Sequence, residues 1–172
     1  MSFEKVLKQA TVCYLCRGSQ ILLAIKARHI GEGCWNGYGG GIEGGETARE
    51  AAVRELKEET GGVIVLPEDL EKIAEIDFHN TKTDGSVFVC KVHFFIARTW
   101  VGEAIETEEM LRPTWFEIDQ IPLDELMPAD KKWLPFALSG KKVKATPRYA
   151  PFQKSLLEDF DVEFVTRFDD PE

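Results

Sequence analysis

The chain has 172 residues, of which 44% are hydrophobic, so it can bury a core without disulfides and falls in the size range of one domain. Lysine and arginine number 21 against 30 aspartates and glutamates, and this net charge of −9 argues against broad binding to nucleic acid backbones. The four cysteines are scattered, and no apolar run resembles a membrane span or a signal peptide. We therefore expect a single domain over residues 1–172 in a cytoplasmic protein that binds neither nucleic acid polymers nor membranes.

The N-terminal part predicts an antiparallel hairpin. Gln9–Arg17 and Gln20–Lys26 are rich in β-forming residues and are separated by a Gly-Ser turn. Cys13 and Cys16 lie three positions apart on the first strand, so their side chains should point to opposite faces. Without a second cysteine pair, this spacing does not indicate a zinc site.

A glycine-rich segment and a helix follow. Six of the nine residues in Gly37–Gly45 are glycine, too many for a stable helix or strand interior, so we expect a loop whose backbone closely approaches another group. The sequence Thr47-Ala48-Arg49-Glu50 has the form of a capping box, and glycines stop the pattern at Gly61. These signals predict a helix from about Ala48 to Thr60.

Later segments predict more strands and a short second helix. Strands on both sides of one central helix, with another helix late in the chain, predict an α+β fold, an α/β/α sandwich with a mixed sheet. The expected strands are Lys72–His79, Ser86–Arg98, Thr114–Ile118 and Asp161–Phe168, and the expected helix is Asp130–Leu138.

The C-terminal extension, about residues 141–172, has no predicted role of its own. Its basic, proline-containing start continues into the segment Lys141–Glu158, which allows a substrate lid, a dimer contact or an extended hairpin connection. The sequence does not choose among these three.

The predicted central helix carries three closely spaced carboxylates. Glu55, Glu58 and Glu59 stand at i, i+3 and i+4, which places them on an arc of roughly 100°. Such crowding is costly without a cation, and hard divalent ions such as Mg²⁺ take oxygen ligands while leaving room for substrate phosphates. Arg54 is four residues from both Glu58 and Glu50 and can pair with both. The alternative interpretation is a solvated charged face, which is common on helices.

The order of these features resembles a known family. Gly40-x5-Glu46-x7-Arg54-Glu55-Leu56-x-Glu58-Glu59-x-Gly61 is similar to the Nudix box of nucleoside-diphosphate-linked hydrolases. One departure is Gly62, where the family has a bulky aliphatic residue, and Val63 can supply that packing one position later.

The resemblance implies a Nudix fold in which residues 40–62 form a loop-helix-loop motif. Glu55, Glu58 and Glu59 would hold Mg²⁺ or Mn²⁺, and a backbone carbonyl near Gly39 or Gly40 would add a ligand. The metal would orient a water and neutralise phosphate charge. Glu55 is the preferred base and Arg54 supports it.

A carboxylate from a later loop can exchange roles with the box glutamates. The candidates are Glu108 and Glu109, of which we take Glu109 as a further metal ligand. An extra residue before Arg112 leaves the register of this loop open.

Similarity beyond the box, over about residues 10–140, points to the branch of oxidised-purine nucleoside triphosphate diphosphatases. It rests on Trp35-Asn36-Gly37-Tyr38-Gly39-Gly40, Arg112-Pro113-x-Trp115-Phe116 and Asp119-Gln120-Ile121-Pro122. The resemblance implies that Asn36 bonds one purine edge, and that Asp130, with Trp133 at the matching position, reads the other. Asp130 has the alternative of capping a helix.

Two departures and two further contacts complete the predicted substrate site. Met127 replaces a base-stacking tryptophan, and Ala129 replaces the first of two aspartates. Met127 could pack on a base through its sulfur, with Trp133 or Phe78 as an aromatic face, and Lys26 could contact phosphate.

The expected function is hydrolysis of a purine or oxidised-purine nucleoside triphosphate to a monophosphate and pyrophosphate. Hydrolysis of ADP-ribose or dinucleoside polyphosphates is a second hypothesis, and a non-catalytic nucleotide sensor is a third. The expected partner is a small nucleotide, bound by a monomer or homodimer.

Overall fold

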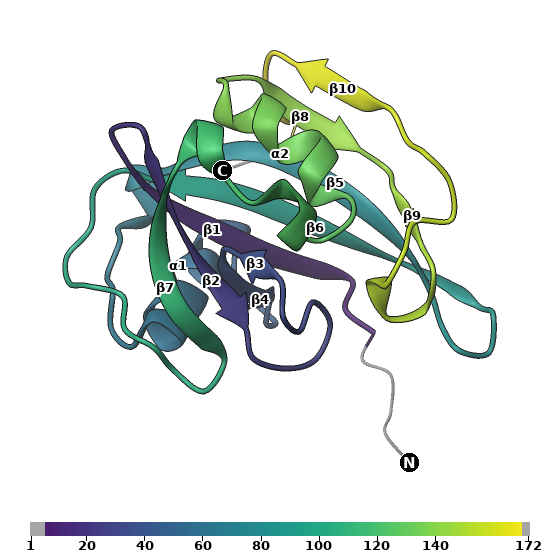
Figure 1. The fold of residues 1–172 in the computed structure, drawn as a ribbon, viewed down its shortest axis with the longest axis horizontal. Coiled ribbons are helices and arrows are strands. Elements are labelled where there is room, and N and C mark those ends of the chain that lie inside the picture. The colour runs from purple at the N-terminus through teal and green to yellow at the C-terminus, as the bar shows by residue number, and fades with distance from the viewer. Residues whose placement is uncertain (1–5, 170–172) are drawn as a thin grey trace.

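In the computed structural model, which describes residues 6–169, strands from the whole length of the chain form one mixed ten-stranded sheet with two α-helices (Figure 1). The elements in chain order are β1 (Gln9–Arg17), β2 (Gln20–Lys26), β3 (Trp35–Asn36), β4 (Tyr38–Gly41), α1 (Ala48–Thr60), β5 (Leu70–Thr81), β6 (Val87–Ala97), β7 (Met110–Glu117), α2 (Asp130–Leu138), β8 (Lys142–Ala145), β9 (Arg148–Tyr149) and β10 (Val162–Val165).

The main path of the sheet runs β10-β8-β5-β6-β1-β2-β3, while β4 pairs with β1, β7 with β2 and β9 with β5. The predicted β1–β2 hairpin is antiparallel, as expected. β1 runs parallel to β6, and β5 runs parallel to β8 and β9, so distant parts of the chain become neighbours. The α+β fold with a mixed sheet is confirmed.

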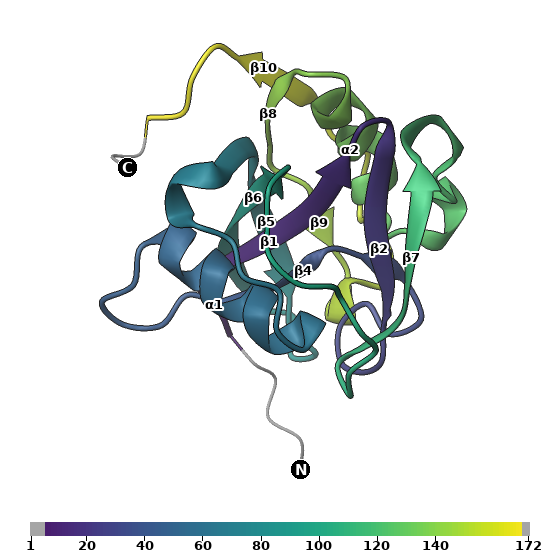
Figure 2. The same cartoon turned by 90° about the vertical axis from the view of Figure 1, so that its left-hand side faces the viewer.

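The helices pack on opposite faces of the sheet (Figure 2). One cluster of buried side chains joins the sheet to α1 through Leu56, and the other joins it to α2 through Trp133. Cys13 belongs to the first cluster and Cys16 to the second, so residues three apart on a strand do point to opposite faces.

The sequence determines both ends of α1. The side chain of Thr47 accepts a hydrogen bond from the backbone nitrogen of Glu50, and the Glu50 carboxylate accepts one from the backbone nitrogen of Thr47. Gly61 ends the helix with a φ of 79°. Val63 is fully buried against the α1 side of the sheet, which confirms the packing expected of it.

The expectation of a loop throughout Gly37–Gly45 is wrong for β4. This strand pairs with β1 through Thr11 opposite Gly40 and Val12 opposite Gly39. A Cβ added to Gly39 would lie 1.8 Å from the carbonyl oxygen of Thr11, so only glycine permits this approach. The glycines therefore allow close strand pairing rather than preventing a strand.

The C-terminal extension adds strands to the sheet. β8 and β9 both pair with β5, and β10 pairs with β8. The predicted closing strand Asp161–Phe168 is shorter than expected, since it covers Val162–Val165. Tyr149, in β9, reaches across to accept a hydrogen bond of 2.7 Å from the backbone nitrogen of Ala129, so the extension supports the start of α2.

Candidate active site

Two glutamates of α1 lie directly on the backbone of β4. The Glu59 carboxylate accepts a hydrogen bond of 3.0 Å from the backbone nitrogen of Gly39. A Cβ added to Gly40 would lie 2.6 Å from Oε1 of Glu55, so the absent side chain makes the space that this carboxylate uses. Glu58 lies further out, with 60% of its side chain exposed. The predicted carboxylates and glycines thus share one site between helix and strand.

The electrostatics of this acidic group are unfavourable without added positive charge. Burial raises the pKa of Glu59 to about 7, although the N–H group of Gly39 acts in the opposite direction. Burial also raises the pKa of Glu55, against the effect of its contact with Arg54. The pKa of each of these two carboxyls is raised further by an acidic neighbour on the same helix face, since Glu55 acts on Glu59 and Glu58 acts on Glu55.

Arg54 links the helix to the segment before it. Its guanidinium makes two hydrogen bonds to Glu46, of 2.7 and 2.9 Å, and one of 2.9 Å to Glu55. It also donates to the carbonyl oxygen of Gly41 and lies 3.6 Å from the Glu58 carboxylate. The expected pair with Glu58 is present, whereas Glu46 takes the place expected for Glu50. The Glu50 carboxylate is used in the helix cap instead.

The donor set fits a hard divalent cation that keeps other ligands. Within residues 6–169, no three His, Cys, Asp or Glu side chains come close enough to enclose a metal ion by themselves. Glu55 and Glu59 offer carboxylate oxygens beside the backbone of β4, and such an open oxygen set suits Mg²⁺ or Mn²⁺, which retain water or phosphate ligands.

A β-bulge lies just after the loop that carries Glu108 and Glu109. Leu23 of β2 pairs with Thr114 and Ile25 with Leu111, so β7 has one residue more than β2 between these two pairs. Arg112 lies within this bulge with a φ of 53°. Sequence alone did not reveal the bulge, because it depends on pairing with β2.

Glu109 lies beside the acidic helix face but binds an arginine. Its carboxylate pairs with Arg28, and its carbonyl oxygen accepts a hydrogen bond from the backbone nitrogen of Ala27. This contact with Arg28 lowers the pKa of Glu109. The charge of Glu109 in turn contributes to the raised pKa of Glu59. Its role as a metal ligand stays a prediction.

Asp130 is a buried carboxyl at the start of α2. It is 4% exposed, and its Oδ1 accepts a hydrogen bond of 3.0 Å from the indole nitrogen of Trp133. Burial raises the pKa of Asp130 to about 7. The helix-cap alternative is wrong, because Ala129 holds the cap position and Asp130 is the first residue of the helix.

The other predicted substrate contacts differ in burial and in their partners. Trp133 is fully buried, so it supports Asp130 rather than offering an open ring face. Phe78 stacks on Tyr149 with ring centroids 5.9 Å apart. The Asn36 side-chain oxygen accepts a hydrogen bond from the backbone nitrogen of Gly37.

The loop between β2 and β3 lies over two more of the predicted contacts. A Cβ added to Gly31 would meet the Met127 sulfur at 2.9 Å and the side chain of Lys26 at 3.2 Å. Lys26 also lowers the pKa of Glu59, which places its ammonium group on the acidic side of the site. Sequence reasoning missed Tyr14 and Tyr149, both of which lie close enough to Asp130 for its charge to raise their pKa values after the larger effect of burial.

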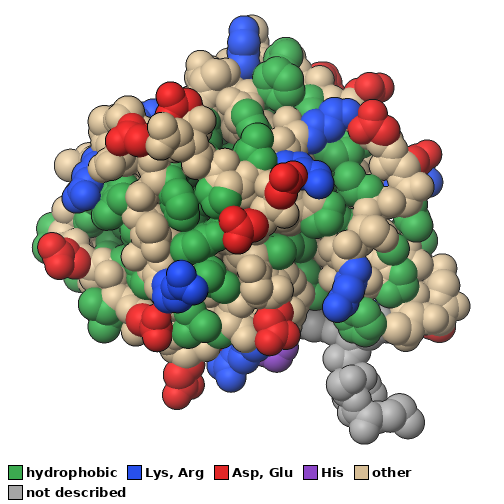
Figure 3. All heavy atoms as spheres, viewed as in Figure 1, with side chains coloured by type: hydrophobic (Ala, Val, Ile, Leu, Met, Phe, Trp, Pro, Cys, Tyr) green, Lys and Arg blue, Asp and Glu red, His purple; other side chains and the backbone are tan. Residues whose placement is uncertain are grey.

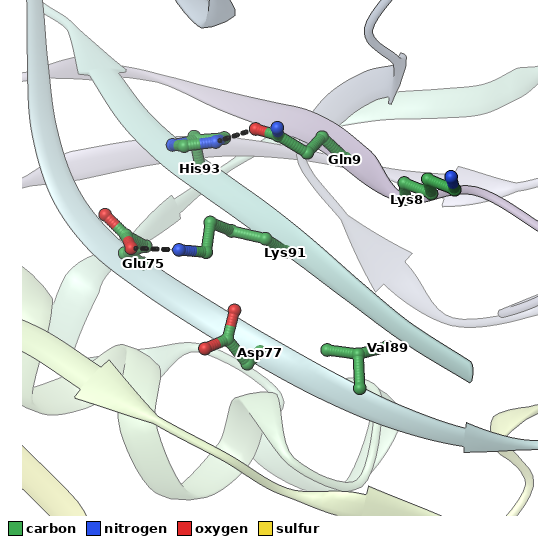
Figure 4. A pocket seen from close by; sticks show the side chains of 7 residues that line it. All are labelled: Lys8, Gln9, Glu75, Asp77, Val89, Lys91 and His93. Carbon is green, nitrogen blue, oxygen red and sulfur yellow. Dashed lines mark hydrogen bonds and ion pairs between the residues drawn. The ribbon is translucent and has the colours of Figure 1, made fainter. Parts of the chain in front are cut away.

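A cavity of about 580 Å³ lies elsewhere, over β5, β6 and the start of β1 (Figure 4). Its polar side chains bond to one another: Glu75 pairs with Lys91 at 3.0 Å, and His93 bonds Gln9 at 2.9 Å. None of the predicted site residues lines it. His93 is buried in this network and also contacts the Lys72 side chain.

Known proteins are similar to this chain in fold and in sequence. The profile of the NUDIX domain matches residues 6–136. The chain therefore belongs to the Nudix family, and its class, Nudix hydrolase, agrees with the expectation from the sequence. A crystal structure of a MutT protein from Bacillus halodurans superimposes with a TM-score of 0.74 at 26% identity, covering 91% of this chain and 98% of that one.

Two curated relatives are more similar in sequence. The oxidized purine nucleoside triphosphate hydrolase of Mus musculus is 40% identical over 132 residues, which covers 77% of this chain and 80% of that protein. The protein of the same name from Danio rerio is 38% identical over 135 residues, covering 78% and 82%.

The surface carries charges of both signs. On the face shown in Figure 3, acidic and basic side chains are interspersed with no continuous basic surface. Neither α-helix in the described residues is long and apolar enough to cross a membrane.

Proposed function

We propose that the protein hydrolyses purine nucleoside triphosphates, oxidised purines among them, to a nucleoside monophosphate and pyrophosphate. The observation that carries this proposal is the placement of Glu55 and Glu59 on the glycine backbone of β4, in a chain 38–40% identical to oxidized purine nucleoside triphosphate hydrolases. An acidic helix face beside an open backbone provides oxygen ligands for a cation and space for phosphates.

Nudix hydrolases generally use divalent metal ions, and we propose Mg²⁺ or Mn²⁺ here. Glu55, Glu58 and Glu59 would hold the ion, with a carbonyl oxygen of Gly39 or Gly40. When bound, it supplies neutralisation of phosphate charge and a more acidic water.

The remaining catalytic tasks fall to groups around the acidic face. Glu55, partly withdrawn from solvent, accepts the proton of the attacking water, and Arg54 holds Glu55 in place. Lys26 meets the outer phosphates. Glu109, which pairs with Arg28 here, would supply a further carboxylate ligand to the ion.

The purine lies between Asn36 and Asp130, with Met127 and Phe78 packing near the ring. The Asn36 oxygen already binds Gly37, which directs the amide nitrogen of Asn36 elsewhere and supports its use as a donor to an acceptor on the base. One carboxyl oxygen of Asp130 accepts the hydrogen bond from Trp133, so the second oxygen binds the base.

The test is a panel of nucleotides with Mg²⁺, with products resolved by chromatography. The panel contains 8-oxo-dGTP, 2-oxo-dATP, the ordinary triphosphates, ADP-ribose and diadenosine tetraphosphate. We expect purine triphosphates to yield monophosphate and pyrophosphate. If the main reaction is instead the conversion of ADP-ribose to AMP and ribose phosphate, the second hypothesis, an ADP-ribose hydrolase, is correct. Binding of nucleotides without any turnover would indicate a nucleotide sensor.

We also propose a cytoplasmic location and a monomer or homodimer. All four cysteines are free, and three of them are buried, which supports a reducing compartment. Light scattering at several concentrations would determine the oligomeric state.

A further inference from the structure

The loop between β2 and β3, residues 27–34, is closed by backbone hydrogen bonds. At its base, the backbone nitrogen of Lys26 donates to the carbonyl oxygen of Cys34 at 3.0 Å, and the carbonyl oxygen of Lys26 accepts a hydrogen bond of 2.9 Å from Gly33. Inside the loop, the backbone nitrogen of Cys34 donates to the carbonyl oxygen of Gly31 at 2.9 Å. The backbone of Gly31 therefore has little freedom to move aside.

Two of the predicted substrate contacts meet this loop at Gly31. A Cβ added there would lie 2.9 Å from Sδ of Met127 and 3.2 Å from Cδ of Lys26. Both distances are shorter than an ordinary van der Waals contact of about 3.5–4.0 Å, so no side chain fits between the loop backbone and these two residues. The absence of a side chain at Gly31 lets the proposed base contact and the proposed phosphate contact lie against the same point of the loop.

Met127 connects this point to the carboxyl proposed to read the base. Its carbonyl oxygen accepts hydrogen bonds of 3.0 and 3.4 Å from the backbone nitrogens of Asp130 and Lys131, so its backbone is tied to the first turn of α2. Its side chain is buried, but a thioether chain is unbranched and changes conformation readily. A methyl group added at Gly31 would therefore displace the sulfur of Met127 rather than unfold the loop. Lys26 would move less, because its carbon lies further away.

We propose that Gly31 is a positioning residue for substrate selectivity: it lets the loop backbone hold the Met127 thioether where a purine ring packs against it. This inference rests on the proposed function, in which Met127 lies near the ring and Lys26 meets the phosphates. A flexible side chain offers a defined surface to a base only when its surroundings restrain it, and the closed loop supplies that restraint. A purine has a larger ring system than a pyrimidine, so purine binding depends more on this surface.

The Gly31→Ala variant tests this role because it adds one carbon against Met127. We expect the dissociation constant of dGMP, measured by calorimetry, to rise about three- to tenfold, and that of dCMP to change by less than about twofold. The preference for dGTP over dCTP in kcat/KM should fall by the same factor as dGMP binding. Binding of pyrophosphate, which involves Lys26 but not Met127, should change by less than about twofold.

Gly33→Ala is the matched control within the same loop. Gly33 has a φ of 83° and Gly31 a φ of 85°, so alanine introduces the same kind of backbone strain at either position. A Cβ at Gly33 would meet no atom of residues 6–169 within 4 Å. Gly33→Ala should therefore lower the melting temperature, as Gly31→Ala does, but keep the wild-type preference for purines.

A double-mutant cycle shows whether Gly31 acts through Met127. In the Met127→Ala background, Gly31→Ala should have little further effect on dGMP binding, because the displaced thioether is absent. Met127→Ala alone should also lower the preference for purines. This single variant keeps the inference testable if Gly31→Ala does not fold, since an unchanged preference in Met127→Ala would overturn it.

Other results would overturn the inference while leaving the proposed function intact. These are unchanged dGMP binding in a folded Gly31→Ala protein, an equal loss of purine preference in Gly33→Ala, and an undiminished effect of Gly31→Ala in the Met127→Ala background. If the wild-type protein hydrolyses no nucleoside triphosphate, the proposed function fails and this inference fails with it. Thermal melting of each variant establishes whether it is folded.

Discussion

Glu59 of α1 accepts a hydrogen bond of 3.0 Å from the backbone nitrogen of Gly39 in β4. Gly39 is itself paired with Val12 of β1, so one contact joins the acidic helix face to the sheet. The position of the proposed metal ligands therefore depends on the strand beneath the helix as much as on helical spacing.

Glu58→Gln should abolish turnover while the fold stays intact. Most of the Glu58 side chain is exposed, so its charge contributes little to stability, whereas a neutral amide is a much weaker ligand for a hard cation. We expect kcat to fall by at least about a hundredfold, measured by pyrophosphate release with Mg²⁺, with an unchanged melting temperature. Glu68→Gln, an exposed control outside the site, should behave as wild type. Near-normal turnover by Glu58→Gln would contradict the metal role.

Gly40→Ala should impair the site through one added carbon. Its Cβ would lie 2.6 Å from Oε1 of Glu55, so the carboxylate must move. We expect a large loss of activity and weaker Mn²⁺ binding, measured by electron paramagnetic resonance.

Gly44→Ala is the matched control for that variant, because a Cβ there meets no atom within 4 Å. It should retain wild-type activity and Mn²⁺ binding. Equal behaviour of the two variants would show that space at Gly40 is unimportant.

Arg54→Lys should lose function despite keeping the positive charge. The guanidinium spans Glu46, Glu55 and the carbonyl oxygen of Gly41, and an ammonium group cannot bridge three such acceptors. We expect about 1–2 kcal/mol lower stability in urea unfolding and roughly tenfold lower kcat. A lysine variant with normal kcat would show that Arg54 does not position Glu55.

Asp130→Asn should stabilise the protein increasingly as pH rises. The folded-state pKa of Asp130 is about 7 against an ordinary value of 3.8, so between these values the folded protein keeps a proton that the unfolded chain releases. Wild-type stability attributable to this group is therefore full below about pH 4 and declines until about pH 7. Asparagine does not titrate and avoids this loss.

The measurement is the melting temperature of both proteins from pH 4 to pH 8. At about 1.4 kcal/mol per pKa unit, the difference reaches a few kcal/mol at most, and each kcal/mol corresponds to about 2–4 °C. Asp119→Asn, at an exposed position, is the control and should follow the wild-type pH dependence. A constant difference between Asp130→Asn and wild type would contradict a raised pKa for Asp130.

Short-range sequence patterns determined those helices and strands that can be recognised without any long-range contact. The capping box at Thr47, the glycine after Thr60 and the i, i+3, i+4 spacing of the glutamates specify α1 and its acidic face without any long-range contact. The two strands of the first hairpin and the bounds of α2 also follow from short-range pattern. These are the elements that sequence predicted most accurately.

Tertiary structure decided which groups those elements meet. The glycine content of Gly37–Gly45 predicts a loop, and only pairing with β1 makes Tyr38–Gly41 a strand. The bulge at Arg112 likewise depends on the pairing of β7 with β2. Burial of Asp130 depends on packing of α2 against the sheet, and no local pattern encodes it.

The tertiary structure also decided which residues distant in sequence contact each other. Arg28 binds Glu109, and Tyr14 lies beneath Gly37, because the sheet brings β1, β2, β4 and β7 together. Sequence spacing fixes which side chains share a helix face, since a helix repeats every 3.6 residues. Contacts between elements depend on strand order and register, which the chain adopts only when its cores on both faces of the sheet are packed.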